Sequence, residues 1–263
     1  MRRMPASVAA AIAVTAAVTA AGPALAGDGT AKPTWQVDVG GDSSHFAKNT
    51  IKDWQDSYIR LGHAVSDTTQ VHVLHWNSHR FGEVDRYFEG GVAHMFAPWA
   101  RGYVAAGGTF AADFSPQRRG DLGGAVRVMS NAEGGVLVAT WLGIDARHSA
   151  YRTGNVDYIA PGLQQYLFDG RAWLTGRYYF MDDELEKRWV GREVRLDWQV
   201  LDRARLWGAY KDLPETTYNV TAPDASRQAG VVLGVTDAID LTLSATRGYP
   251  RRETVGAALT VRF

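Results

Sequence analysis

The chain of 263 residues contains no cysteine, and beyond residue 26 it has no apolar stretch of about 18 residues. The lack of cysteine excludes a small domain stabilised by disulfides. The lack of a long apolar run excludes a transmembrane helix in that part of the chain. Neither sign of charge is in excess, since 28 basic residues stand against 28 acidic ones. A broad basic surface for nucleic acid is therefore excluded too.

Residues 1–26 have the pattern of a secretory signal peptide. Arg2 and Arg3 precede an apolar run of small residues, and Ala24-Leu25-Ala26 has the form of a cleavage site. We therefore expect export, a short periplasmic segment at residues 27–34, and one folded domain at residues 35–263. Without its two leading arginines the chain would carry 26 basic and 28 acidic residues, a formal net charge of −2.

The last ten residues alternate strictly between apolar and polar side chains. This pattern predicts a strand with one apolar face that runs to the terminal aromatic residue, as expected of a strand that closes a barrel in a membrane. The segment resembles the C-terminal insertion signal of bacterial outer-membrane barrels, whose positions are filled here by Thr254, Gly256, Leu259, Val261 and Phe263. That resemblance implies a contact with the barrel-assembly machinery during insertion.

From Trp35 onward the alternation predicts about fourteen strands, and twelve strands is the alternative. We expect short turns near residues 66–68, 97–98, 131–135, 168–171, 201–203 and 236–238. We expect longer loops at residues 41–50, 78–85, 111–120, 147–155, 181–188, 212–226 and 247–252. Two loop classes that alternate in this way favour an all-β, antiparallel, up-and-down transmembrane barrel with long loops at one end.

The strand near residues 190–200 has one charged and one apolar face. Glu193, Arg195 and Asp197 alternate with apolar residues, and Arg177 on the preceding strand is expected to lie opposite them. A charge turned toward lipid at mid-depth costs about 2–4 kcal/mol, so these residues are candidates for the lumen of a barrel. There they would tune the selectivity of a pore or fill a plugged barrel. A soluble periplasmic sandwich would show the same alternation, so this pattern alone does not decide the fold.

Three of the seven histidines lie within residues 71–79. We interpret His75 and His79 as polar residues of the lumen or the loop rim. The alternative is a lipid or glycan hydrolase of the outer membrane, which would need one of them beside a serine on a neighbouring strand and an orienting acid or amide. The sequence contains no G-x-S-x-G turn. A metal site would need further ligands from another strand. We predict no catalytic residue, metal or cofactor.

The mature sequence resembles the YaiO family of outer-membrane β-barrel proteins. The likeness rests on the strand order, on Arg80-Phe81, on residues 88–119 with Trp99 and the segment Phe110 to Arg118, and on the final Arg262-Phe263. It implies a non-enzymatic, porin-like barrel in the outer membrane of a Gram-negative bacterium, acting as a channel or a scaffold. Its partners would be outer-membrane lipid, lipopolysaccharide and a system for polysaccharide synthesis or export.

Overall fold

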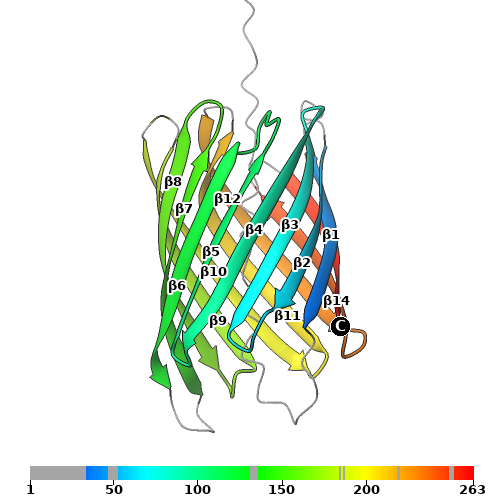
Figure 1. Cartoon of the computed structure of the whole chain (residues 1–263), viewed down its shortest axis with the longest axis vertical. Coiled ribbons are helices and arrows are strands. Elements are labelled where there is room, and N and C mark those ends of the chain that lie inside the picture. The colour runs from blue at the N-terminus through cyan, green and yellow to red at the C-terminus, as the bar shows by residue number, and fades with distance from the viewer. Residues whose placement is uncertain are drawn as a thin grey trace, which may run out of the picture.

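The computed structural model describes residues 34–46, 53–130, 136–183, 185, 187–217, 220–248 and 252–263. Fourteen antiparallel strands form a closed barrel, in which each strand pairs with its neighbours in sequence and the first pairs with the last (Figure 1). The predicted up-and-down barrel and its strand number are confirmed. The predicted signal peptide lies outside the described residues, as does the segment before Thr34.

The strands differ little in length and run in the following order. They are β1 (Trp35–Phe46), β2 (Trp54–Ala64), β3 (Thr69–Arg80), β4 (Glu83–Ala97), β5 (Ala100–Thr109), β6 (Arg118–Ser130), β7 (Leu137–Ala150), β8 (Asn155–Leu167), β9 (Ala172–Asp182), β10 (Arg188–Leu201), β11 (Ala204–Thr217), β12 (Val220–Gly234), β13 (Ile239–Gly248) and β14 (Arg252–Arg262). Among the described residues, no helix is long and apolar enough to cross a membrane.

The barrel is closed by its two outermost strands, β1 and β14. They pair from Gln36 opposite Arg262 to Phe46 opposite Arg252. Beyond this ladder, Trp35 N donates to Phe263 O at 2.9 Å and Phe263 N donates to Trp35 O at 3.0 Å. Both ends of the strand series therefore lie at one mouth of the barrel, marked by the C label in Figure 1. We call this mouth the terminal end, and the opposite mouth the distal end.

The predicted difference in loop length between the two ends holds only in part, since residues 110–117 form a long connection at the distal end. At the distal end, the expected loops 78–85 and 212–226 are wrong, because pairing continues to Arg80 opposite Glu83 and to Thr217 opposite Val220. Phe81 and Gly82 make the first of these turns with φ of 57° and 91°, as a tight hairpin requires. The strands extend past the apolar part of the sheet, where polar side chains on both faces hide the alternation.

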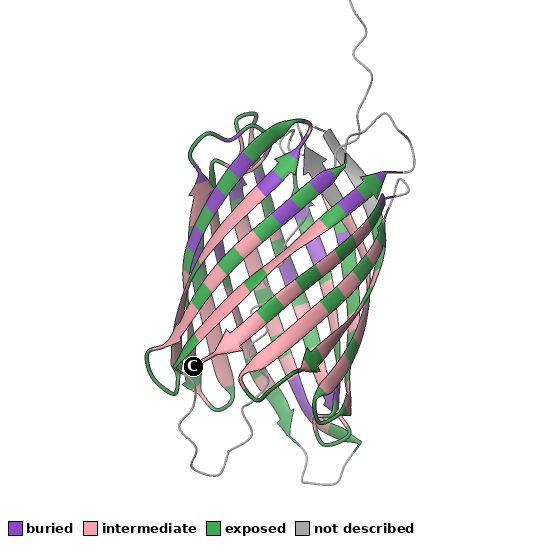
Figure 2. Ribbon diagram, turned by 90° about the vertical axis from the view of Figure 1, so that its right-hand side faces the viewer, coloured by how far each residue is buried: buried purple, intermediate pink, exposed green. Residues whose placement is uncertain are grey.

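The outside of the barrel is apolar along every strand, as the alternation of burial in Figure 2 illustrates. Each strand turns at least one exposed aliphatic side chain outward: Val39, Ile59, Val73, Val92, Val104, Leu122, Ile144, Ile159, Leu174, Val194, Leu206, Leu233, Leu243 and Leu259. A continuous apolar surface of this kind is typical of a band that contacts lipid. Many of the buried side chains are instead charged or polar.

Candidate functional site in the barrel lumen

The structure places all four charged residues singled out on β9 and β10 inside the barrel. Glu193 and Asp197 are 4% and 1% exposed, whereas Val194 between them is 48% exposed on the outside. Arg177 lies directly opposite Glu193 in the β9–β10 ladder, and its Nη1 is 3.9 Å from Glu193 Oε2. Arg195 donates two hydrogen bonds to Asp197, at 2.6 and 2.8 Å.

His75 and His79 do not line the lumen, so the lumen part of that interpretation is corrected. His75 pairs with Ile59, which is 47% exposed on the outer surface, and it stacks on the outward-facing Phe88 at 4.3 Å between ring centroids. His79 lies on the same face of β3, two pairs further on. Side chains alternate along a strand, so His72 is the residue of the three that points inward.

The outward histidines have polar neighbours on β2. Ser57 lies opposite Asn77, and Asn77 is two residues from both His75 and His79. These four residues are on one face near the distal end of β3. Within the described part of the chain, no hydrogen bond joins Ser57 to either histidine. The arrangement supplies a serine and an amide beside the histidines, but not a formed nucleophile–base pair.

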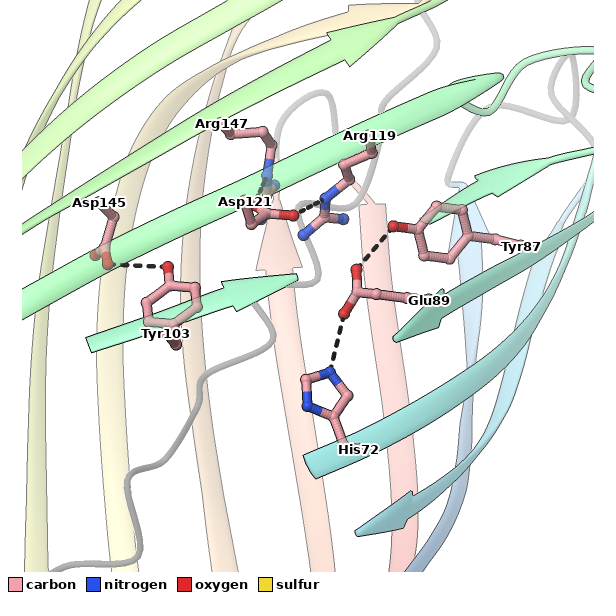
Figure 3. A network of polar contacts seen from close by, with 8 residues as sticks. All are labelled: His72, Tyr87, Glu89, Tyr103, Arg119, Asp121, Asp145 and Arg147. Atoms are coloured by element: carbon pink, nitrogen blue, oxygen red, sulfur yellow. Dashed lines mark hydrogen bonds and ion pairs between the residues drawn. The ribbon is translucent and has the colours of Figure 1, made fainter. Parts of the chain in front are cut away.

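A polar network begins on the inner wall at β3 and β4. His72 Nε2 is 3.4 Å from Glu89 Oε1, and Tyr87 donates its hydroxyl proton to Glu89 Oε2 at 2.7 Å (Figure 3). Glu89 is 5% exposed. Its carboxylate is therefore held on both sides by groups from the barrel wall, as a buried charge requires.

The network continues on β6 and β7 around a second buried carboxylate. Asp121 accepts hydrogen bonds from Arg119 Nε at 2.6 Å and from Arg147 Nε at 2.5 Å (Figure 3). Arg119 lies over the ring of Tyr87 at 5.8 Å, which joins this cluster to the one on β4. Two cations thus share one carboxylate.

Further round the barrel the same arrangement repeats on β5 to β11. Asp145 accepts a hydrogen bond from Tyr103 at 2.9 Å and pairs with Arg177 Nε at 3.2 Å. Glu193 accepts a hydrogen bond from Tyr179 at 2.8 Å and pairs with Lys211 at 3.3 Å. The residues from His72 to Lys211 that make these contacts form what we call the lumen network.

The cations that pair with Glu193 lie nearer the water of the lumen than its carboxylate. The side chain of Arg177 is 27% exposed and that of Lys211 is 15% exposed, whereas that of Glu193 between them is 5% exposed. The Glu193 carboxylate therefore holds these cationic groups against the wall.

Several large rings of the lumen lie against glycines on the neighbouring strand. A Cβ atom built on Gly123 would come within 2.5 Å of the Tyr103 ring, and one on Gly230 within 2.5 Å of the Trp207 ring. The ring of Tyr58 lies against Gly40 in the same way, and the ring of Tyr87 lies against Gly107. Each ring occupies the space of the missing side chain and so lies along the wall instead of crossing the lumen. Sequence reasoning missed this feature, although glycine at inward positions of the strands was a signal.

A loop lies against the inner side of the wall at the distal end. Residues 110–117 connect β5 to β6, and the 1% exposed carboxylate of Asp85 accepts hydrogen bonds from three of their backbone N–H groups. Those groups belong to Asp113, Phe114 and Ser115, at 2.9, 3.0 and 2.6 Å. Phe114 is 7% exposed and meets Phe81 edge-on at 6.1 Å. The loop is thus anchored on the inward face of β4.

A closed barrel with an apolar exterior and a charged interior defines a protein of the outer-membrane β-barrel fold. The chain is similar to the crystal structure of Omp33 from Acinetobacter baumannii, at 10% identity and a TM-score of 0.57, over 89% of this chain and 100% of that one. It is also similar to a bacterial polysaccharide outer membrane secretin, at 10% identity and a TM-score of 0.60, over 89% of this chain and 99% of that one. No protein-family model and no curated protein matches the chain. The YaiO resemblance therefore stays a prediction.

Proposed function

We propose that the protein is a non-enzymatic channel of the bacterial outer membrane. One observation carries this proposal: the barrel has an aliphatic exterior and a lumen lined by partly exposed charged groups. The apolar band fits the acyl chains of outer-membrane lipid and lipopolysaccharide, while the lumen fits water. Fourteen strands give a diameter between that of side-chain-filled barrels of eight strands and that of open porins of about sixteen.

The side-chain arrangement favours a channel over a plug. The side chains of Arg177, Arg195 and Arg205 remain 26–28% exposed although they form ion pairs. The rings of Tyr58, Tyr87, Tyr103 and Trp207 lie against glycines of the neighbouring strands, along the wall of the barrel. Opposite the lumen network, the inner wall of β12 to β14 and β1 carries mostly small side chains, among them Gly230, Ser244, Gly256 and Ala258. Among the ion pairs on β12 to β14 and β1 in the described residues, the one between Arg262 and Asp240 lies on this wall.

The terminal end faces the periplasm in this proposal, since an even number of strands returns the chain to the side from which insertion begins. The apolar face of β14 would be recognised by the barrel-assembly machinery through Thr254, Gly256, Leu259, Val261 and Phe263. The polysaccharide role rests on the YaiO resemblance, and it agrees with the similarity of the barrel to a polysaccharide outer membrane secretin. A polysaccharide synthesis or export system would be the partner.

Conductance tests the channel. The chain from residue 27, refolded in detergent and confirmed as a barrel by its faster gel mobility before heating, is added to planar bilayers. Stepwise currents with a linear voltage dependence are the expected result if the charged lumen holds a continuous path of water. A heat-modifiable barrel that inserts without any current would reject the channel and leave the scaffold.

The position of Ser57 beside His75, His79 and Asn77 favours a second candidate, an outer-membrane acyl hydrolase. The chemistry would need a proton to pass from the Ser57 hydroxyl to one histidine as the serine attacks an ester. The refolded barrel is assayed with a short-chain ester and with phospholipid in micelles. Activity that is lost in both His75→Ala and Ser57→Ala would establish the hydrolase. Equal turnover in these variants and in the unchanged barrel would reject it.

A further inference from the structure

Arginine and aromatic side chains alternate on the inner wall near the terminal end. Several stand close to the start or end of their strands: Arg101 is the second residue of β5, Trp173 the second of β9 and Arg205 the second of β11. We name the whole set the arginine–tryptophan belt, and its members are Arg101, Arg127, Trp141, Tyr166, Trp173, Arg195, Arg205 and Trp207.

The first half of the belt is built on β5 to β8. The guanidinium of Arg101 lies 4.6 Å from the ring centroid of Trp141, and its Nη2 donates to Gln164 Oε1 at 3.0 Å. Arg127 approaches the same tryptophan ring at 5.9 Å. Stacking and the hydrogen bond together fix the plane of the Arg101 guanidinium.

The second half continues on β9 to β11. The ring centroids of Tyr166 and Trp173 are 6.1 Å apart, and the Arg205 guanidinium lies 5.4 Å from the centroid of the Trp173 ring. Arg195 lies 4.4 Å from the centroid of Trp207. Asp197 is the one carboxylate that pairs with the belt among the described residues, since it contacts both Arg195 and Arg205.

The belt carries more positive charge than its contacts neutralise. The belt has four arginines, and only Arg195 and Arg205 pair with Asp197, which is 1% exposed. Within the described residues, Arg101 and Arg127 form no ion pair. Guanidinium groups that are oriented but lack a carboxylate keep N–H donors for an anion that enters the lumen.

We propose that the arginine–tryptophan belt binds acidic oligosaccharide at the periplasmic mouth, an inference that rests on the proposed channel. A sugar ring has an apolar face that fits the exposed side of a tryptophan, and the carboxylate of a uronic acid fits the planar fork of an arginine. Alternating arginines and aromatic rings match a polymer in which every unit carries both features. A small inorganic anion would use the arginines but would not need the rings. A neutral glycan would use the rings but not the arginines.

The site lies where a polymer that leaves the periplasm meets the barrel first. Capture at this mouth raises the local concentration of an anionic chain before it enters the lumen.

A mannuronate hexamer serves as the probe and the neutral maltohexaose as its control. Tryptophan fluorescence of the refolded barrel in uncharged detergent gives the affinity, and transient block of the bilayer current gives an independent measure. We expect the acidic hexamer to bind at least tenfold more tightly than the neutral one. Removal of two belt charges in Arg101→Gln/Arg127→Gln should weaken its binding at least about tenfold, which corresponds to the loss of one charge-assisted hydrogen bond.

The matched control is Arg86→Gln/Arg118→Gln, which removes two exposed arginines outside the lumen and near the distal end. This variant should bind the acidic hexamer like the unchanged barrel. Equal binding of both hexamers, or equal loss in the two double variants, would overturn the proposal. Because fluorescence needs no current, binding in a barrel that does not conduct would retain the belt and reject the channel. A barrel that conducts but does not bind the acidic hexamer would retain the channel and reject the belt.

Discussion

Asp121 illustrates what one lumen residue contributes to the barrel. Its carboxylate is 6% exposed and joins the guanidiniums of Arg119 and Arg147. Asp121→Asn would leave two poorly hydrated cations without their shared counter-charge. Breaking a buried pair in this way costs about 3–5 kcal/mol. We expect Asp121→Asn to unfold at a lower urea concentration than the unchanged barrel in detergent. The folded fraction is measured from the fast-migrating, heat-modifiable gel band.

Asp157→Asn is the matched control for Asp121→Asn. Asp157 pairs with His148 at 2.6 Å, but both side chains are more than half exposed. Water and salt screen such a pair, so its removal should change stability by about 0–1 kcal/mol. A urea midpoint lowered as much by Asp157→Asn as by Asp121→Asn would contradict the assigned role of burial.

The direction of single side chains was predictable where alternation was read strictly. The inward positions of Glu193, Arg195 and Asp197 follow from their apolar neighbours. The same rule puts His75 on the outward face of β3, together with Val73. His75 was wrongly assigned to the lumen because its polarity was given more weight than its position in the alternation. The pairing of Ser57 with Asn77 could not be foreseen, since it depends on the register between two strands.

The β11–β12 pair shows how two strands keep the lumen open. A Cβ atom on Gly230 would lie 2.5 Å from the Trp207 ring, so Gly230→Ala should push that ring off the wall. We expect a smaller single-channel conductance with the barrel still folded. Gly176→Ala is the control, because Gly176 lies on the outward face of β9 with nothing within 4 Å of the added atom. Unchanged conductance in Gly230→Ala would show that the ring does not limit the path.

The loop of residues 110–117 depends on one side chain of β4. Asp85→Asn removes the charge that holds three backbone N–H groups, and each charge-assisted hydrogen bond contributes about 1.5–3 kcal/mol. We expect the loop to leave the wall and trypsin to cleave faster after Arg118. The control is Asp113→Asn, whose carboxylate makes an exposed contact of 3.8 Å with Arg152. Equal cleavage rates in the two variants would reject the anchor.

The strands could be predicted from the sequence more completely than their connections. Period-two alternation marks a strand wherever one face meets lipid and the other meets water. Residues 212–226 lack that contrast, so their sequence indicates a loop although most of them pair as strand. Backbone pairing does not need an apolar face, and for this reason the length of the strands beyond the membrane escaped prediction.

The closed barrel as a whole was foreseen from features at both ends of the chain and from the alternation between them. Of the lumen network, only the position of Arg177 opposite Glu193 was predicted, and the arginine–tryptophan belt was not. Both join residues on five or more strands, such as Arg101 on β5 and Gln164 on β8. Their contacts follow from the shear and curvature of the barrel, which a single sequence does not specify.

The membrane position of the barrel predicts opposite effects for neighbouring residues at mid-height. Leu243 is 42% exposed and points outward near the middle of β13, whereas Thr242 points into the lumen. Leu243→Arg places a charge in the apolar band, at a cost of about 2–4 kcal/mol at the bilayer midplane, while Thr242→Arg leaves the charge in water. We expect the urea midpoint in phospholipid vesicles to fall only for Leu243→Arg, and the conductance to change only for Thr242→Arg. If both variants were equally stable in lipid, the aliphatic surface would not be facing acyl chains.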